Sequence, residues 1–259
     1  MDITFKRTWR LALFIQLAII LLLIVFSSVV VAGEWRVSPT RVDFDKGSKS
    51  SVITVWNESK EILTFSTEAL AWTQDDSGKD MYASTGDLVF FPKVLTIKPG
   101  ESRVIRVGVR APAVQTEKSY RLFIKEQPSK EAAKAGTVAV VMQFAIPVFS
   151  KPVQESFAGS FENVVLRDGV LSLLLRNTGN VFFRINDVNF SGKDETSREV
   201  FKHELKGWYL LTGSARDFSI DFPSEICRTI HVLEVVVNTD RGPLTRQIEL
   251  NQEMCSSSQ

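Results

Sequence analysis

The chain of 259 residues is poor in the side chains on which most enzymes rely. It contains two histidines, His203 and His231, and neither has a cysteine or a carboxylate at the spacing of a metal site. A Gly-x-Ser-x-Gly motif, a glycine-rich phosphate loop and a His-Glu-x-x-His motif are all absent. We therefore expect no enzyme, no metal and no cofactor. A hydrolase on a β-sandwich scaffold is the enzymatic alternative, and its turnover would have to depend on one of the histidines.

The chain also lacks an excess of charge of either sign. It carries 31 basic and 30 acidic residues, for a formal net charge of +1. This balance provides no basic surface for a nucleic acid or an anionic membrane. We therefore expect no nucleic-acid partner.

The long apolar run of the chain is confined to its N-terminus. Basic residues, among them Arg10, precede an apolar stretch over residues 11–26, and the small residue Ala32 precedes Gly33. This order is typical of an export signal and favours removal of residues 1–32 by cleavage after Ala32. Because the apolar run approaches the roughly 20 residues that span a bilayer, a retained membrane anchor is the alternative.

Sustained helical periodicity is absent beyond this signal. Short alternating segments are instead separated by turn-forming clusters such as Lys98-Pro99-Gly100, a pattern typical of immunoglobulin-like sandwiches. Lys151-Pro152 interrupts the pattern, so we predict an all-β protein with two immunoglobulin-like domains, residues 33–151 and 152–259. The predicted strands are Trp35–Asp43, Ser51–Trp56, Leu63–Leu70, Val89–Phe91, Ser102–Val109, Ser119–Glu126 and Thr137–Phe149, then Gly169–Arg176, Phe182–Phe190, Val200–Glu204, Gly207–Leu211, Arg216–Phe222, Thr229–Asn238 and Leu244–Leu250.

The two cysteines flank the last predicted hairpin. Cys227 comes just before one strand and Cys255 just after the other, so antiparallel pairing about a turn near Asp240 brings them together at the open end. Because export leads to an oxidising compartment, we predict a disulfide between them. Two free thiols are the alternative.

The predicted strand Thr137–Phe149 is apolar on both faces. Its side chains alternate, which places Val138, Val140, Met142, Phe144 and Ile146 on one face and Ala139, Val141, Gln143 and Ala145 on the other. One face can cover the core of its own domain. The other face is then covered either by the same chain, as in a central sandwich strand, or by another protein.

Several motifs together resemble the periplasmic chaperones of the chaperone–usher pilus pathway, the PapD-like family. They are VSPTRVDF (37–44), IKPG (97–100) with Arg106, YRLFIKEQP (120–128), IPVFSKP (146–152), NTGN (177–180), and WYLL (208–211) through Arg216. The resemblance implies two immunoglobulin-like domains set at an angle, a periplasmic location and no enzymatic activity. It also implies two partners: pilus subunits and an outer-membrane usher that receives them.

By the same resemblance, the last strand of the first domain is donated to a subunit whose own fold lacks a strand. The residues expected to enter the subunit are Val138, Val140, Met142 and Phe144. The free chain is expected to be able to self-associate through this strand. A membrane-anchored binding protein with a different ligand is the alternative.

The resemblance also implies a cationic anchor for the terminal carboxylate of the subunit. Arg41 matches the expected arginine, with a solvated strand residue as the alternative, whereas the expected lysine falls on Pro147. Either Arg103 or Lys125 substitutes for the lysine, or Arg41 acts alone.

A charge network that fixes the interdomain angle is implied as well. Its members map onto Glu126, Lys151 and Asp240.

Overall fold

The computed structural model describes residues 16, 35–45, 47–110, 113, 115–128, 140–251, 254 and 255. The predicted signal, residues 1–32, lies outside this part of the chain except for Gln16. Within the described residues, no helix has both the length and the apolar character needed to cross a bilayer. Residues 36–259 form one compact unit.

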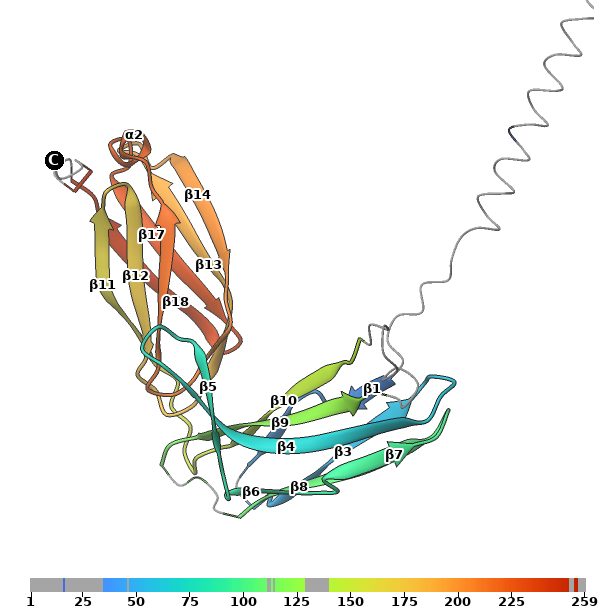
Figure 1. Ribbon diagram of the computed structural model, residues 1–259. Helices are drawn as coiled ribbons and strands as arrows, with labels where there is room; N and C mark the ends of the chain where they lie inside the picture. The colour runs from blue at the N-terminus through green and yellow to red at the C-terminus, as the bar shows by residue number, and fades with distance from the viewer. Residues whose placement is uncertain are drawn as a thin grey trace, which may run out of the picture. The chain divides into compact units, whose positions relative to one another are not determined.

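The first half of the chain forms two sheets of a β-sandwich (Figure 1). One sheet has the order β1-β3-β8-β6, and the other has the order β2-β10-β9-β4-β5 with β7 added beside β4. The strands are β1 (Trp35–Ser38), β2 (Val42–Phe44), β3 (Ser50–Asn57), β4 (Leu63–Gln74), β5 (Asp80–Ser84), β6 (Leu88–Phe91), β7 (Val94–Ile97), β8 (Ser102–Val109), β9 (Lys118–Gln127) and β10 (Gln143–Ser150).

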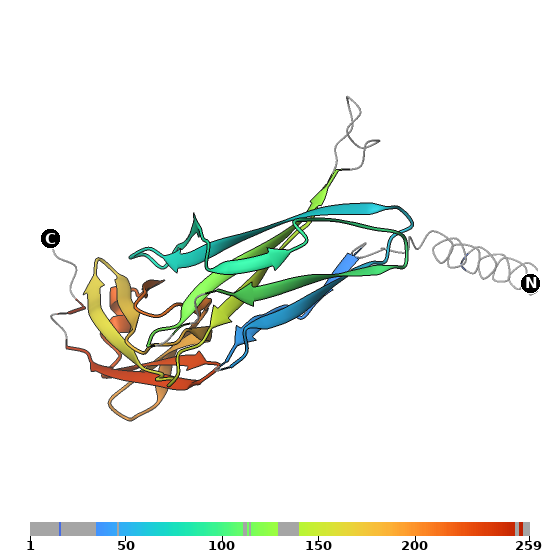
Figure 2. The same ribbon diagram turned by 90° about the horizontal axis from the view of Figure 1, so that it is seen from below.

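Alternation of side chains explains how these strands pack. On β3, Ile53 and Val55 are fully buried while their neighbours are partly exposed, and on β9 the buried row includes Leu122 and Ile124. These inward rows form the core of the first sandwich, which Figure 2 shows from below as long strands running side by side. A hydrophobic row buried in this way is the main source of stability for a sheet that is polar on its other face.

The second half of the chain forms another sandwich from a three-stranded and a five-stranded sheet. The first has the order β11-β12-β16, and the second has the order β14-β13-β17-β18 with β15 beside β13. The elements are β11 (Gly159–Arg167), β12 (Val170–Asn177), β13 (Phe183–Lys193), β14 (Glu199–Lys206), β15 (Tyr209–Leu210), β16 (Ala215–Asp221), α2 (Ser224–Cys227), β17 (Val232–Thr239) and β18 (Gly242–Glu249). The all-β fold class is therefore confirmed.

Some elements differ from the sequence prediction. Strands β5, β7 and β11 were not predicted, and the single strand predicted over Trp35–Asp43 is divided into β1 and β2. The division falls at Pro39, which has no N–H for a ladder, and there the chain passes from one sheet to the other.

The strand predicted to begin at Thr137 begins at Gln143 instead. Residues 137–139, including Val138, lie outside the described part of the chain, whereas residues 140–142 are described and are not in a strand. The register pairs Gln143 with Lys125, so Val140 would lie opposite Pro128, just beyond the end of β9. The strand therefore begins two residues after the position opposite the end of β9.

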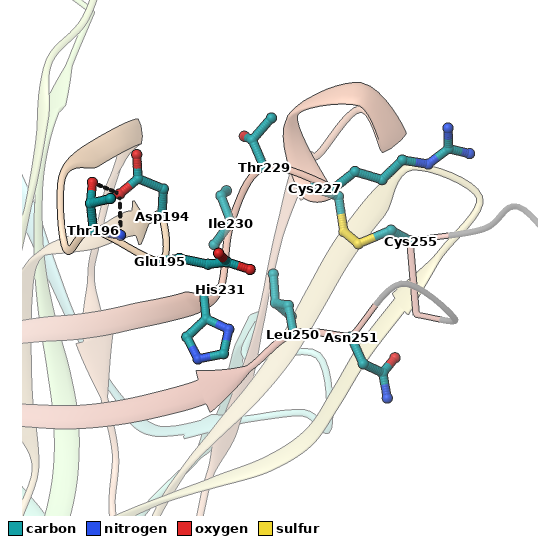
Figure 3. Close-up of a pocket in the computed structure, with 11 residues that line it drawn as sticks. Asp194, Glu195, Thr196, Cys227, Thr229, Ile230, His231, Leu250, Asn251 and Cys255 are labelled. Atoms are coloured by element: carbon teal, nitrogen blue, oxygen red, sulfur yellow. Dashed lines mark hydrogen bonds between the residues drawn. A yellow bond between two sulfur atoms is a disulfide. The ribbon is translucent and has the colours of Figure 1, made fainter.

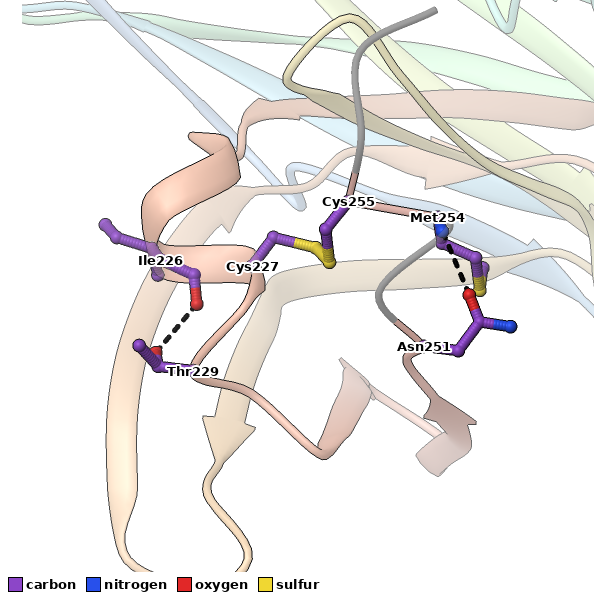
Figure 4. Close-up of a disulfide and its surroundings, with 6 residues drawn as sticks. All are labelled: Ile226, Cys227, Thr229, Asn251, Met254 and Cys255. Carbon is purple, nitrogen blue, oxygen red and sulfur yellow. Dashed lines mark hydrogen bonds between the residues drawn. A yellow bond between two sulfur atoms is a disulfide. The ribbon is translucent and has the colours of Figure 1, made fainter.

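The predicted disulfide between Cys227 and Cys255 is present, with 5.6 Å between the Cα atoms (Figure 4). Cys227 is the last residue of the short helix α2, and β17 and β18 pair in antiparallel fashion from Val232 with Glu249 to Thr239 with Gly242. The hairpin thus brings the two cysteines together at its open end, as its turn predicts.

Candidate functional site

A pocket of about 400 Å³ beside the disulfide shows no arrangement for catalysis (Figure 3). His231 and Asp194 both line it. The Asp194 carboxylate is engaged within its own turn, where it accepts hydrogen bonds from the Thr196 hydroxyl and amide. The other histidine, His203, stacks on Phe201 on exposed strand β14. Across the described residues, no group of three or more His, Cys, Asp or Glu side chains is arranged to hold a metal ion.

Strand β10 changes from buried to exposed along its length. Ile146 and Val148 are buried in the core, Phe144 and Met142 are partly exposed, and Val140 just before the strand is 87% exposed. Phe144, Ile146 and Val148 lie at alternate positions of β10 and belong to its inward row. Met142 and Val140 continue this alternation in the sequence, but they precede the strand and are more exposed.

The start of β10 is held to β9 by Glu126. The Glu126 amide donates to the Met142 carbonyl at 3.1 Å, and the Met142 amide donates to the Glu126 carboxylate at 3.3 Å. These bonds position Met142 one residue before the strand begins. Val140 and Val141 lie beyond this last point of attachment and are both exposed.

Arg41 lies immediately before β2, the strand that pairs in parallel with the far end of β10. Its Nε donates to the Asp43 carboxylate at 2.8 Å, and its side chain is 45% exposed. The guanidinium also lies 5.8 Å from the ring centre of Phe182, in the second sandwich. Arg41 is therefore a partly solvated cation beside the junction of the two sandwiches.

Arg121 is the cation opposite Pro147, and the sequence prediction missed it. It pairs with Pro147 in the β9–β10 register, is only 5% exposed and donates to the Ala145 carbonyl at 3.0 Å. Its guanidinium lies 3.7 Å from the ring centre of Trp72, and its Nε is buried without a hydrogen-bond partner. Burial lowers the pKa of Arg121 below its ordinary value.

Arg121 lies on the neighbouring strand opposite Pro147, where the lysine was expected, but its side chain is buried against Trp72 and supports the junction. The two substitutes expected from the sequence lie elsewhere. Arg103 is on β8, in the other sheet, and Lys125 pairs with Gln143, four residues before Pro147. Four strand residues span about 13 Å, so neither occupies the place of Pro147.

An aromatic cluster joins the two sandwiches next to these arginines. It consists of Trp72, Phe149, Phe182, Tyr209 and Leu211. The Phe149 and Phe182 rings stack with centres 3.8 Å apart, and Trp72 meets Tyr209 edge to face at 5.2 Å. Aromatic pairs of this kind contribute about 0.5–1.5 kcal/mol each beyond the area that they bury.

Within the described residues, the three members of the predicted charge network are not brought together. Glu126 lies at the opposite end of β10 from Lys151, a separation of about 26 Å for eight strand residues. Asp240 instead accepts a hydrogen bond from the Arg184 amide. Lys151 contacts Asp45 at 2.9 Å and Glu155 at 3.6 Å, and Glu155 in turn contacts Arg241 at 2.7 Å. A network at the junction exists, therefore, but only Lys151 among its members was predicted.

With this geometry in place, comparison with known proteins finds a family that the first sandwich matches. Residues 35–155 match the family described as "Pili and flagellar-assembly chaperone, PapD N-terminal domain". The chain is 30% identical over 135 residues to "Probable fimbrial chaperone EcpE" of Escherichia coli K12, a match that covers 49% of this chain and 51% of that protein. The chain thus spans about half the length of the curated relatives that it matches.

The solved structures extend the likeness to both sandwiches. The class 5 fimbriae chaperone CfaA gives a TM-score of 0.56 at 15% identity and covers 82% of this chain and 98% of its own. The CsuC–CsuE chaperone–adhesion subunit complex of Acinetobacter baumannii gives 0.57 at 22% identity, covering 84% and 98%. The complex of the Salmonella enterica SafA pilin with the SafB chaperone gives 0.55 at 12%, covering 84% and 97%. At these identities the likeness shows the fold.

These matches indicate the class first: residues 35–155 match the PapD N-terminal domain family of assembly chaperones. The fold of both sandwiches is that of the solved chaperones CfaA and CsuC. The matched family is described as one of assembly chaperones, which agrees with the expectation of no enzymatic activity.

Proposed function

We propose that the chain is a fimbrial chaperone that works in the periplasm, captures pilus subunits and passes them to an outer-membrane usher. The observation that carries this proposal is the exposure of Val140, three residues before the start of β10. A solved relative fold, in the complex of CsuC with the CsuE subunit, is described as a pre-assembly complex of a chaperone with an adhesion subunit. The EcpE relatives are likewise described as fimbrial chaperones.

The capture mechanism that we propose is that the segment before β10, from residue 138 onward, pairs with the subunit as a donated strand. Addition of an extended segment to an open sheet edge provides main-chain hydrogen bonds, while alternate side chains fill pockets and fix the register. Val140 and Met142 belong to this alternate row, and Phe144 is next in it. Burying one such side chain contributes about 1.5–3 kcal/mol before the costs of association are subtracted.

Arg41 is the cation that we propose for the terminal carboxylate of the subunit, acting without a lysine. A guanidinium can bind a carboxylate through two parallel hydrogen bonds. Arg41 is open to solvent on part of its surface, whereas Arg121 is buried among aromatic rings. Exposure therefore favours Arg41 as the group that meets a partner.

The proposal is tested by capture of polypeptides from the cell envelope with wild-type and substituted chains. We expect Val140→Asp to lose the captured subunit while the chaperone keeps its thermal stability, because Val140 makes little contact with its own sandwich. Val165→Asp is the matched control, since Val165 is an exposed valine on β11 of the second sandwich. Unchanged capture by Val140→Asp would contradict strand donation.

A further inference from the structure

Glu117 is a buried carboxylate at the junction of the two sandwiches that the proposed capture mechanism does not use. It lies just before β9, is 5% exposed, and accepts a hydrogen bond from the Phe182 amide through Oε1 at 2.9 Å. Its own amide donates to the Asn180 carbonyl, also at 2.9 Å. Glu117 therefore forms two hydrogen bonds from the first sandwich to the turn that precedes β13.

The second oxygen of the Glu117 carboxylate forms no such hydrogen bond. Oε2 of Glu117 is buried without a hydrogen-bond partner, and no cation of the described residues forms a salt bridge with Glu117. A buried charge in this position is expensive, so the neutral carboxylic acid is the form that suits the closed junction. The aromatic cluster packs beside the same junction, since Phe182 belongs to both.

The charged groups around Glu117 do not compensate a negative charge on its carboxylate. Arg241, from the β17–β18 turn, favours the ionised form, whereas Asp43 from β2 and Glu155 from the segment between the sandwiches oppose it. Each of these three already has a partner: Arg241 contacts Glu155, Glu155 contacts Lys151, and Asp43 contacts Arg41. The neighbouring pocket of about 490 Å³ adds the charged residues Asp75, Asp76, Asp87 and Lys118, of which the last two form a salt bridge at 2.9 Å.

We propose that Glu117 is a proton-controlled latch, which holds the two sandwiches together when it is neutral and loosens their junction when it is ionised. Opening the junction would bring water to Oε2 and release both hydrogen bonds to the Asn180–Phe182 turn. It would also move Phe182 away from Arg41, which lies over its ring. The latch does not depend on the proposed function, although it would connect pH to the site proposed for the subunit.

The direction of the pH effect follows from the surroundings of Glu117. Burial, the largest cause, raises its pKa from 4.5 to about 7 in the closed protein. In an opened junction the pKa returns toward 4.5, so the closed form is most favoured below that pH. The free energy that favours the closed form decreases as the pH rises from 4.5 to about 7, and above that pH it no longer changes.

Hydrogen exchange at the Phe182 amide tests the latch in the full exported chain. With the two pKa values above, we expect its protection to fall by roughly 40-fold between pH 5 and pH 7, after correction for intrinsic exchange. Protection should stay below that of Val235, in the core of the second sandwich, because opening the junction needs no unfolding of that core. Glu117→Gln should remove the pH dependence.

Glu126→Gln is the matched control, because Glu126 also accepts a backbone hydrogen bond at the other end of β9 but does not reach the second sandwich through it. It should keep the wild-type pH profile at Phe182. The proposal is overturned if the wild-type profile is flat, if Phe182 exchanges as slowly as Val235, or if Glu117→Gln keeps the wild-type slope. The wild-type profile alone decides the matter should the glutamine variant not fold.

Discussion

Arg41→Ala separates a role in capture from a role in folding. The ion pair of Arg41 with Asp43 is partly exposed, and such pairs contribute about 0–1 kcal/mol to stability. Hydrogen bonds from a charged donor to a subunit carboxylate are worth about 1.5–3 kcal/mol. We therefore expect the free energy of unfolding in urea to change by at most about 1 kcal/mol, and affinity for the subunit to fall by about 10- to 150-fold.

The assay compares a captured subunit that ends in a free carboxylate with the same subunit ending in an amide. If Arg41 binds the carboxylate, the wild-type chain should discriminate between the two and the alanine variant should not. Asp43 needs its own control, because Arg41→Ala removes the cation that pairs with its carboxylate, and its Oδ1 is already buried without a hydrogen-bond partner. Arg41→Ala with Asp43→Asn removes both charges together. Equal weakening of both subunits by Arg41→Ala would refute the anchoring role.

Two further predictions concern stability. Replacing Cys227 and Cys255 by serine should lower the free energy of unfolding by about 3–4 kcal/mol, because the disulfide closes a loop across 28 positions, and calorimetry with and without reductant checks this. Arg121→Ala should destabilise the chain by about 2–4 kcal/mol through lost packing and lost cation–π contact with Trp72, whereas Arg121→Met should cost less because it keeps the volume and removes a buried charge. If urea denaturation showed equal decreases in the free energy of unfolding for the two Arg121 variants, the charge would matter more than the packing.

Local alternation in the sequence was sufficient to predict most of the strands and the disulfide hairpin. The buried row of β9 and the pairing of β17 with β18 both follow from side chains that alternate on either side of a turn. The start of β10 at Gln143 did not follow, because the apolar run begins at Thr137 and continues on both sides of Gln143. An apolar run shows where a strand can extend but not where its pairing begins.

The junction between the sandwiches was the least predictable part of the molecule. Glu117 contacts a backbone amide 65 positions away, and nothing in its local sequence distinguishes it from a solvated glutamate. Arg121 likewise becomes visible only when the antiparallel register places it opposite Pro147. The distance between two members of the predicted network was missed for the same reason, since Glu126 and Lys151 are separated by the length of a strand whose register the sequence does not provide.

The most direct test of strand donation is amide exchange at Val140 and Val141 in the free chaperone and in its complex with a captured subunit. Both residues lie outside the strand in the free chain, so we predict rapid exchange there and strong protection once the subunit pairs with them. Exchange that stays equally rapid in a stable complex would contradict the account, because the subunit would then be held without the help of this strand.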